Sequence, residues 1–106
     1  MMTIPAPGVR LSDDLDDPQA VPYFLWDAPS TVGELRERLR RAPGPERAQL
    51  LGRILREARD TDVWRFTTPR EVVELWAEVS RHLGTRRAFW EFLLGRWRRL
   101  GLDERA

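Results

Sequence analysis

The chain has 106 residues, of which 42% are hydrophobic and 33% are charged, as is typical of one small globular domain. It contains no cysteine and one histidine, His82, which excludes disulfides, thiolate chemistry and a multi-histidine metal site within one chain. The formal net charge is only +1, but the first 30 residues hold five aspartates against one arginine, whereas the remainder is mildly basic.

Residues 1–22 are predicted to form a flexible, acidic and proline-rich arm. They hold four prolines and four aspartates and too few large apolar groups to offset the entropy lost on ordering. Alternatively, the arm folds onto a basic partner and contacts it through its aspartates. The segment lacks the apolar block of a signal peptide, and no apolar run approaches the roughly 20 residues of a membrane span, so a cytoplasmic protein is expected. The aspartates of the arm are Asp13, Asp14, Asp16 and Asp17.

The remainder, residues 23–106, is predicted to be one helical domain. It opens with the apolar run 23–28, which has no second strand to pair with and is interpreted as an extended segment. Thr31 and Glu34 have capping-box spacing at the start of a first helix. Pro43, Gly44 and Pro45 then separate that helix from a second one.

The second half of the chain shows similar signals for the starts and ends of helices. Residues 60–67 break the helical pattern and are interpreted as a turn. Thr68, followed by Pro69 and Glu71, restarts a helix, and Gly84 is suited to end it. No β-hairpin signal occurs, so the fold class is all-α: a small single-domain bundle of four main helices with an extended, partly disordered N-terminal arm. The helices are expected at about 31–42, 45–59, 69–83 and 86–100.

No constellation of residues indicates catalysis. His82 lies near the end of the third predicted helix, where the helix dipole favours it, and no nucleophile stands at suitable spacing. Asp60 and Asp62 form a weak metal pair that a turn explains equally well. Three glutamates lie on one face of the third predicted helix and are interpreted as a solvated face: Glu71, Glu74 and Glu78. No catalytic, cofactor or metal site is expected.

The last predicted helix carries the most informative surface. At 100° per residue its apolar side chains span about 200°, more than one core-facing stripe requires. Trp90, Leu94 and Trp97 are flanked by Arg87 and Arg98, and tryptophan with arginine is the composition of binding hot spots. Two interpretations stay open: this side binds a partner, or the apolar segment before the first helix folds back over it.

Arginine clusters in the first and last predicted helices raise the alternative of nucleic-acid binding, because arginine binds phosphate and stacks on bases. Two glutamates, Glu34 and Glu37, interleave with the first cluster, and the net charge is modest. Solvated helix faces are therefore the preferred interpretation of these arginines. The first cluster consists of Arg36, Arg38, Arg40 and Arg41, and the last of Arg86, Arg87, Arg96, Arg98 and Arg99.

Three stretches carry a family resemblance: residues 23–27, residues 54–59 followed by 62–66, and residues 68–72. Together they resemble small bacterial and archaeal proteins encoded beside nucleotidyltransferase toxins of the abortive-infection type. The resemblance implies the antitoxin half of a toxin–antitoxin pair, which is no enzyme and has no catalytic residue to carry over. The partner it implies is a toxin similar to nucleotidyltransferases that transfer nucleotides from NTP, in some cases to tRNA.

The function expected from the sequence is therefore a protein-binding module, an antitoxin that neutralises a nucleotidyltransferase toxin by direct binding. The chain has no winged-helix DNA domain of the kind that larger antitoxins of this class carry. The alternatives are a small arginine-rich regulator that binds nucleic acid and a structural subunit that forms homo-oligomers.

Overall fold

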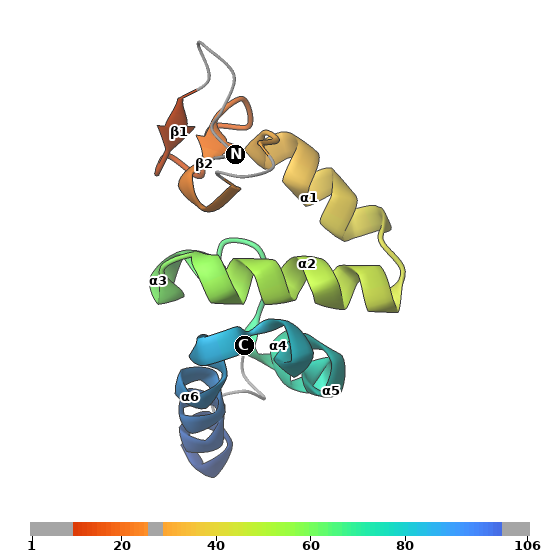
Figure 1. Cartoon of the computed structure of the whole chain (residues 1–106), viewed down its shortest axis with the longest axis vertical. Helices are drawn as coiled ribbons and strands as arrows, with labels where there is room; N and C mark the ends of the chain where they lie inside the picture. Colours follow the sequence, from red (N-terminus) through yellow and green to blue (C-terminus); the bar gives the residue numbers. More distant parts are fainter. Residues whose placement is uncertain (1–9, 26–28, 101–106) are drawn as a thin grey trace. The chain divides into compact units, whose positions relative to one another are not determined.

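The computed structural model describes residues 10–25 and 29–100. The chain divides into two compact units, Met1–Ala42 and Pro43–Ala106 (Figure 1). The described part is mostly helical, as predicted, and none of its helices has the length and apolar character needed to cross a bilayer. The prediction of four main helices is not confirmed, because this part contains six α-helices, of which only three have 10 residues or more.

The first unit begins with two very short strands, β1 (Leu11–Ser12) and β2 (Val21–Pro22), which pair in parallel with Leu11 opposite Val21. The loop between them turns back tightly and buries Leu15, which is 1% exposed. Parallel strands are not joined by a simple hairpin turn. The absence of a hairpin signal in the sequence therefore did not predict the absence of this strand pair.

Helix α1 (Val32–Arg41) follows, and its start is fixed by the predicted capping box. The Thr31 hydroxyl accepts a hydrogen bond from the Glu34 amide at 3.1 Å, and the Glu34 carboxylate accepts one from the Thr31 amide at 2.9 Å. The hydrogen bond from the Thr31 backbone, reinforced by its side chain, lowers the pKa of Glu34 below its usual value. Because only local residues are needed, the sequence alone could predict this box.

The loop between the strands completes the cap of α1. The first amides of a helix have no partner inside the helix. In this unit the Ala20 carbonyl accepts a hydrogen bond from Val32 at 2.8 Å, and the Pro18 carbonyl accepts one from Gly33 at 3.0 Å. Residues 10–22 are therefore an integral part of the first unit, which differs from the expected flexible arm and from its boundary after residue 22. The rest of that arm, residues 1–9, lies outside the described residues.

The apolar segment before α1 also differs from its prediction. Tyr23–Leu25 form a single 3₁₀ turn rather than an extended stretch. The Phe24 ring is 1% exposed and meets the Tyr23 ring edge-on at 5.3 Å between centroids. Burial of this ring favours a compact turn, whereas the expectation for residues 26–28 lies outside the described residues.

The second unit is built around α2 (Gly44–Glu57), whose apolar side is fully buried at Ala48, Leu51, Ile54 and Leu55. The elements after it are short, and their bounds are α3 (Asp60–Val63), α4 (Pro69–Glu74), α5 (Trp76–Val79), the 3₁₀ turns Ser80–His82 and Gly84–Arg86, and α6 (Arg87–Leu100).

Two predictions about these elements are wrong. Residues 60–63 form the short helix α3 instead of a turn. The helix expected over 69–83 is interrupted at Leu75, whose backbone (φ −99°, ψ 11°) leaves the helical region and separates α4 from α5. Periodicity did not show the break, because the buried residues on either side of it, Val72 and Val79, still fit one apolar arc.

The structure explains why glycine occupies two positions in this unit. Gly52 in α2 lies so close to the turn Ser80–His82 that a Cβ built on it would be 2.4 Å from the Cβ of His82. Gly84 has φ +53°, the left-handed conformation that ends helical segments and that glycine adopts without strain. The predicted stop at Gly84 is thus confirmed.

The Gly52→Ala variant tests the close approach of α2 and this turn. The added methyl group would force backbone apart, because the atom it meets is a Cβ and not the flexible end of a side chain. We expect a loss of about 1–3 kcal/mol in the free energy of unfolding, measured by urea denaturation. Gly44→Ala on the same helix is the control, since a Cβ there meets nothing within 4 Å. Equal stability of the two variants would contradict the packing described.

The Thr31→Ala variant tests the cap of α1. Loss of the hydroxyl acceptor should cost about 1 kcal/mol of stability, and Thr31→Ser should retain most of it. In an NMR pH titration the pKa of Glu34 should rise only part of the way to its usual value, because the backbone amide at position 31 still donates. The stabilisation belongs to the ionised carboxylate, so it is present above the usual glutamate pKa and is lost as the pH falls through the lowered one.

An unchanged pKa of Glu34 in Thr31→Ala, together with unchanged stability, would contradict the capping box.

Candidate protein-binding surface

Trp90, the first residue predicted to contact a partner, lies in the interior. Its side chain is fully buried, and its indole N–H donates a hydrogen bond to the Leu55 carbonyl at 2.9 Å. The Trp64 ring meets it edge-on, with centroids 5.7 Å apart. Trp90 therefore joins α6 to the end of α2 and is a core residue.

Leu94 and Trp97 continue along the same side of α6. Leu94 is 4% exposed, and Trp97 is half-buried with its ring tilted against Trp64 at 5.3 Å. This corrects the sequence interpretation: the tryptophan side of α6 is its core side, and Trp64 from the same unit packs against it. Helical periodicity identifies residues that share a side but does not say which side faces the core.

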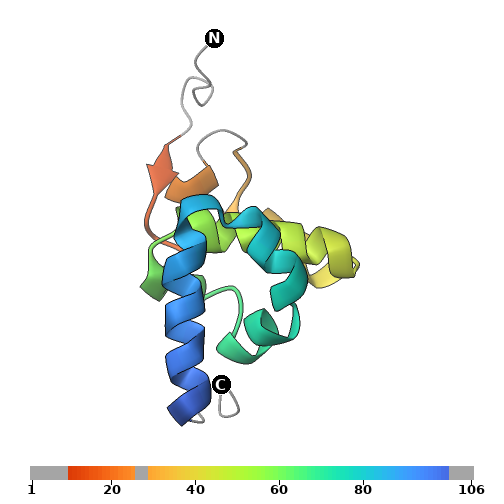
Figure 2. The ribbon, with the colours of Figure 1, turned by 60° about the horizontal axis from the view of Figure 1, so that its bottom comes forward.

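The exposed apolar side chains of α6 lie elsewhere on the helix. Phe89 is 39% exposed, Phe92 62% and Leu100 59%. At 100° per residue these three and Arg96 lie within an arc of about 80°, which we call the outer face of α6. Figure 2 shows α6 running away from α2. The outer face was part of the over-wide apolar arc, but the sequence analysis did not single it out.

Arginines lie on and beside the outer face. The Arg86 guanidinium lies 5.1 Å from the centroid of the Phe89 ring, and that of Arg96 lies 6.0 Å from the Phe92 ring. These distances are within the range of cation–π contacts. The outer face therefore combines aromatic area with positive charge.

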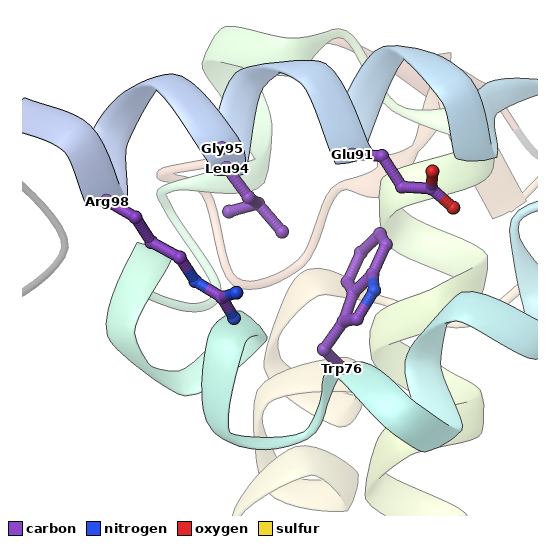
Figure 3. A pocket seen from close by; sticks show the side chains of 5 residues that line it. All are labelled: Trp76, Glu91, Leu94, Gly95 and Arg98. Carbon is purple, nitrogen blue, oxygen red and sulfur yellow. The ribbon is translucent and has the colours of Figure 1, made fainter.

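The two arginines predicted to flank the surface lie away from the outer face. Arg87 pairs with Glu91 one turn later, with 2.6 Å between Nε and Oε1. Arg98 lines a hollow of about 240 Å³ between α5 and α6 (Figure 3). The other residues around this hollow are Trp76, Glu91, Leu94 and Gly95.

The four aspartates of the N-terminal segment lie in the loop of the first unit and are all exposed. Asp14 accepts a hydrogen bond from the Asp16 amide at 3.3 Å, and Asp17 accepts one from the Gln19 amide at 2.9 Å. These carboxylates thus stabilise the turns of the loop. Neither they nor any other acidic or histidine side chains of the described residues form a group of three that could hold a metal ion. The fourth aspartate of this loop is Asp13.

The residues considered for catalysis or metal binding have contacts that belong to the fold. The backbone carbonyl of half-buried His82 accepts a hydrogen bond from Arg56 at 3.3 Å. Asp60 begins α3, and Asp62 lies 4.0 Å from the Arg65 guanidinium. No nucleophile is brought to His82 by these contacts.

Glu71 corrects the predicted solvated face. It is half-buried, and its carboxylate accepts hydrogen bonds from Arg47 Nε at 2.8 Å and from the Thr67 hydroxyl. It thereby links α4 to the start of α2. Glu74, by contrast, is exposed and pairs with Arg70 at 3.3 Å, as a solvated face requires.

Comparisons with protein-family models, with curated proteins and with solved structures find no match. The resemblance to proteins encoded beside nucleotidyltransferase toxins stays an expectation from three sequence stretches. The surface itself carries the functional argument.

The Trp90→Phe variant tests the assignment of Trp90 to the core. Phenylalanine fills much of the space but leaves the Leu55 carbonyl without its donor, so we expect a loss of about 1–3 kcal/mol in unfolding free energy. Trp97→Phe is the control, because the Trp97 ring is half-buried and should tolerate the exchange at less than about 1.5 kcal/mol. Chemical denaturation followed by circular dichroism measures both. A Trp90→Phe protein as stable as the parent would place Trp90 outside the core.

Proposed function

We propose that this chain is a non-enzymatic protein-binding module that docks through the outer face of α6. The observation that carries the proposal is the exposure of Phe92, 62%, and Leu100, 59%, on the same helix side as Phe89. Apolar groups at positions i, i+3 and i+11, with Arg96 at i+7, are the spacing by which helices pack on a partner. Aromatic and arginine side chains are enriched in such interfaces.

Ion pairs neutralise part of the arginine clusters, which counts against nucleic acid as the partner. On α1, Glu37 pairs with both Arg40 and Arg41, and the hydrogen bond from Arg40 lowers the pKa of Glu37 while it raises that of Arg40. On α6, Arg87 pairs with Glu91. A phosphate backbone needs unneutralised cations, and interleaved glutamates weaken its binding.

The partner we propose is an acidic surface of a nucleotidyltransferase toxin, and the chain would be its antitoxin in the cytoplasm. The family resemblance of residues 23–27, 54–59 with 62–66, and 68–72 supports this identity. The positive charge on and beside the outer face supports an acidic contact, since complementary charge speeds association and fixes orientation. The exposed aspartates of the first unit would contact a basic nucleotide or tRNA site of the toxin.

A second copy of the chain is a less favourable occupant of the outer face. Arg96 lies in the middle of the exposed stripe, and Arg86 and Arg99 lie near its two ends. Two such faces would bring like charges together without an acidic residue of the stripe between them. Self-association is therefore an outcome to be measured by sedimentation and not the proposed function.

The proposal predicts that Phe92→Ala weakens toxin binding. Loss of a hot-spot ring should raise Kd by at least about 30-fold, equivalent to ~2 kcal/mol, without changing the free energy of unfolding. Isothermal titration with the purified nucleotidyltransferase measures the affinity. Arg70→Ala is the control, because Arg70 is exposed on α4, away from the outer face.

Equal binding by Phe92→Ala would exclude the outer face. Absence of a nucleotidyltransferase among proteins recovered stoichiometrically from nuclease-treated native lysate would overturn the antitoxin assignment. Binding of nucleic acid that falls steeply with salt would favour the regulator instead.

A further inference from the structure

The hollow between α5 and α6 has no part in the docking surface proposed above. Its wall is formed by Trp76 from α5 and by four residues of α6, and its volume is about 240 Å³. That volume is below the range of about 300–1,000 Å³ typical of small-molecule sites, so the hollow suits a single protruding group. By helical geometry its α6 residues are centred roughly 150° around the helix from the outer face.

Among the residues that line the hollow, Arg98 supplies the one cation. Glu91 is neutralised by Arg87, with 2.6 Å between the charged atoms. Arg98 makes no hydrogen bond or ion pair with another residue in the described ranges 10–25 and 29–100. Figure 3 shows Arg98 and Glu91 on opposite sides of the Trp76 ring. A ligand therefore meets a guanidinium beside an aromatic ring.

Gly95 leaves the hollow open. A Cβ built at this position would meet only the end of the Arg99 side chain, at 3.7 Å, which is an ordinary contact. Glycine in the middle of a helix is less favourable than alanine, and nothing in the fold requires it here. The missing side chain gives a ligand access along α6 to Leu94 and Trp76.

We propose that the hollow binds one carboxylate carried beside an aromatic or aliphatic group of a partner polypeptide. The Arg98 fork matches the two oxygens of a carboxylate, while Trp76 and Leu94 contact the neighbouring apolar group. A phosphate is a poorer fit, because the Glu91 carboxylate lies in the wall of the hollow and Arg98 is the one cation among the residues that line it. The source of the carboxylate rests on the proposed function, but binding of the chemical group does not.

The test is a titration of the whole chain with N-acetyl-L-phenylalanine, which carries a carboxylate beside an aromatic ring. Chemical shifts of the Trp76 indole N–H, assigned with a Trp76→Phe variant, measure binding by NMR. A fragment of this size should bind with Kd of about 1 mM. The neutral amide of the same compound should bind at least about tenfold more weakly, since it lacks the charge that Arg98 recognises.

Two variants separate the contributions of charge and space. Arg98→Gln should weaken binding at least about tenfold by removing the cation, and Gly95→Met should abolish it by filling the hollow. Arg96→Gln, on the outer face, should bind as the parent does. Circular dichroism confirms that each variant is folded, and Gly95→Met should be no less stable than the parent, because nothing but Arg99 approaches the site.

Equal affinity for acid and amide, or full affinity in Arg98→Gln, would overturn the proposal. Because the probe titration uses the isolated chain, its failure would leave docking through the outer face intact. Failure of toxin binding with retained, Arg98-dependent binding of the probe would instead overturn the proposed function and keep the carboxylate site.

Discussion

The hydrogen bond from the Trp90 indole to the Leu55 carbonyl determines which side of α6 faces the core of the second unit. Leu55 lies in the last turn of α2, where carbonyls have no partner inside the helix, and the indole N–H supplies one at 2.9 Å. The bond sets the rotation of α6 about its own axis, because Trp90 must point inward to reach it. With that rotation set, Phe92 and Arg96 point away from the core.

The features that could be predicted from the sequence depend on neighbours within a few residues. The cap of Thr31 on Glu34 and the cap of Thr68 on Glu71 follow from spacing alone, and Gly84 marks a stop by its conformational freedom. The rotation of α6 could not be predicted in this way. Its apolar arc is wide enough to allow the core on either side, and only the non-local contact with α2 decides between them.

Composition did not predict the order of residues 10–22 in the first unit, and the reason is again a non-local contact. Proline and aspartate suggest a chain that cannot bury enough surface, yet the contacts that order residues 10–22 are made by main-chain carbonyls. Those of Pro18 and Ala20 accept hydrogen bonds from the first amides of α1, and Leu15 is buried alongside. Main-chain pairing leaves no trace in composition, whereas the turns that the aspartates form do follow from their side chains.

Burial of Trp90 also explains why the outer face of α6 stays exposed. Covering Phe92 with the chain's own core would require α6 to rotate by more than a third of a turn, which would remove the indole from Leu55 and expose the largest buried side chain of the unit. The apolar stripe of α6 therefore faces outward while Trp90 stays buried. A surface fixed before binding loses little conformational freedom on association, so more of its contact energy becomes affinity. For the docking that we propose, this would be the physical advantage of phenylalanines on the side of α6 that its tryptophans leave uncovered.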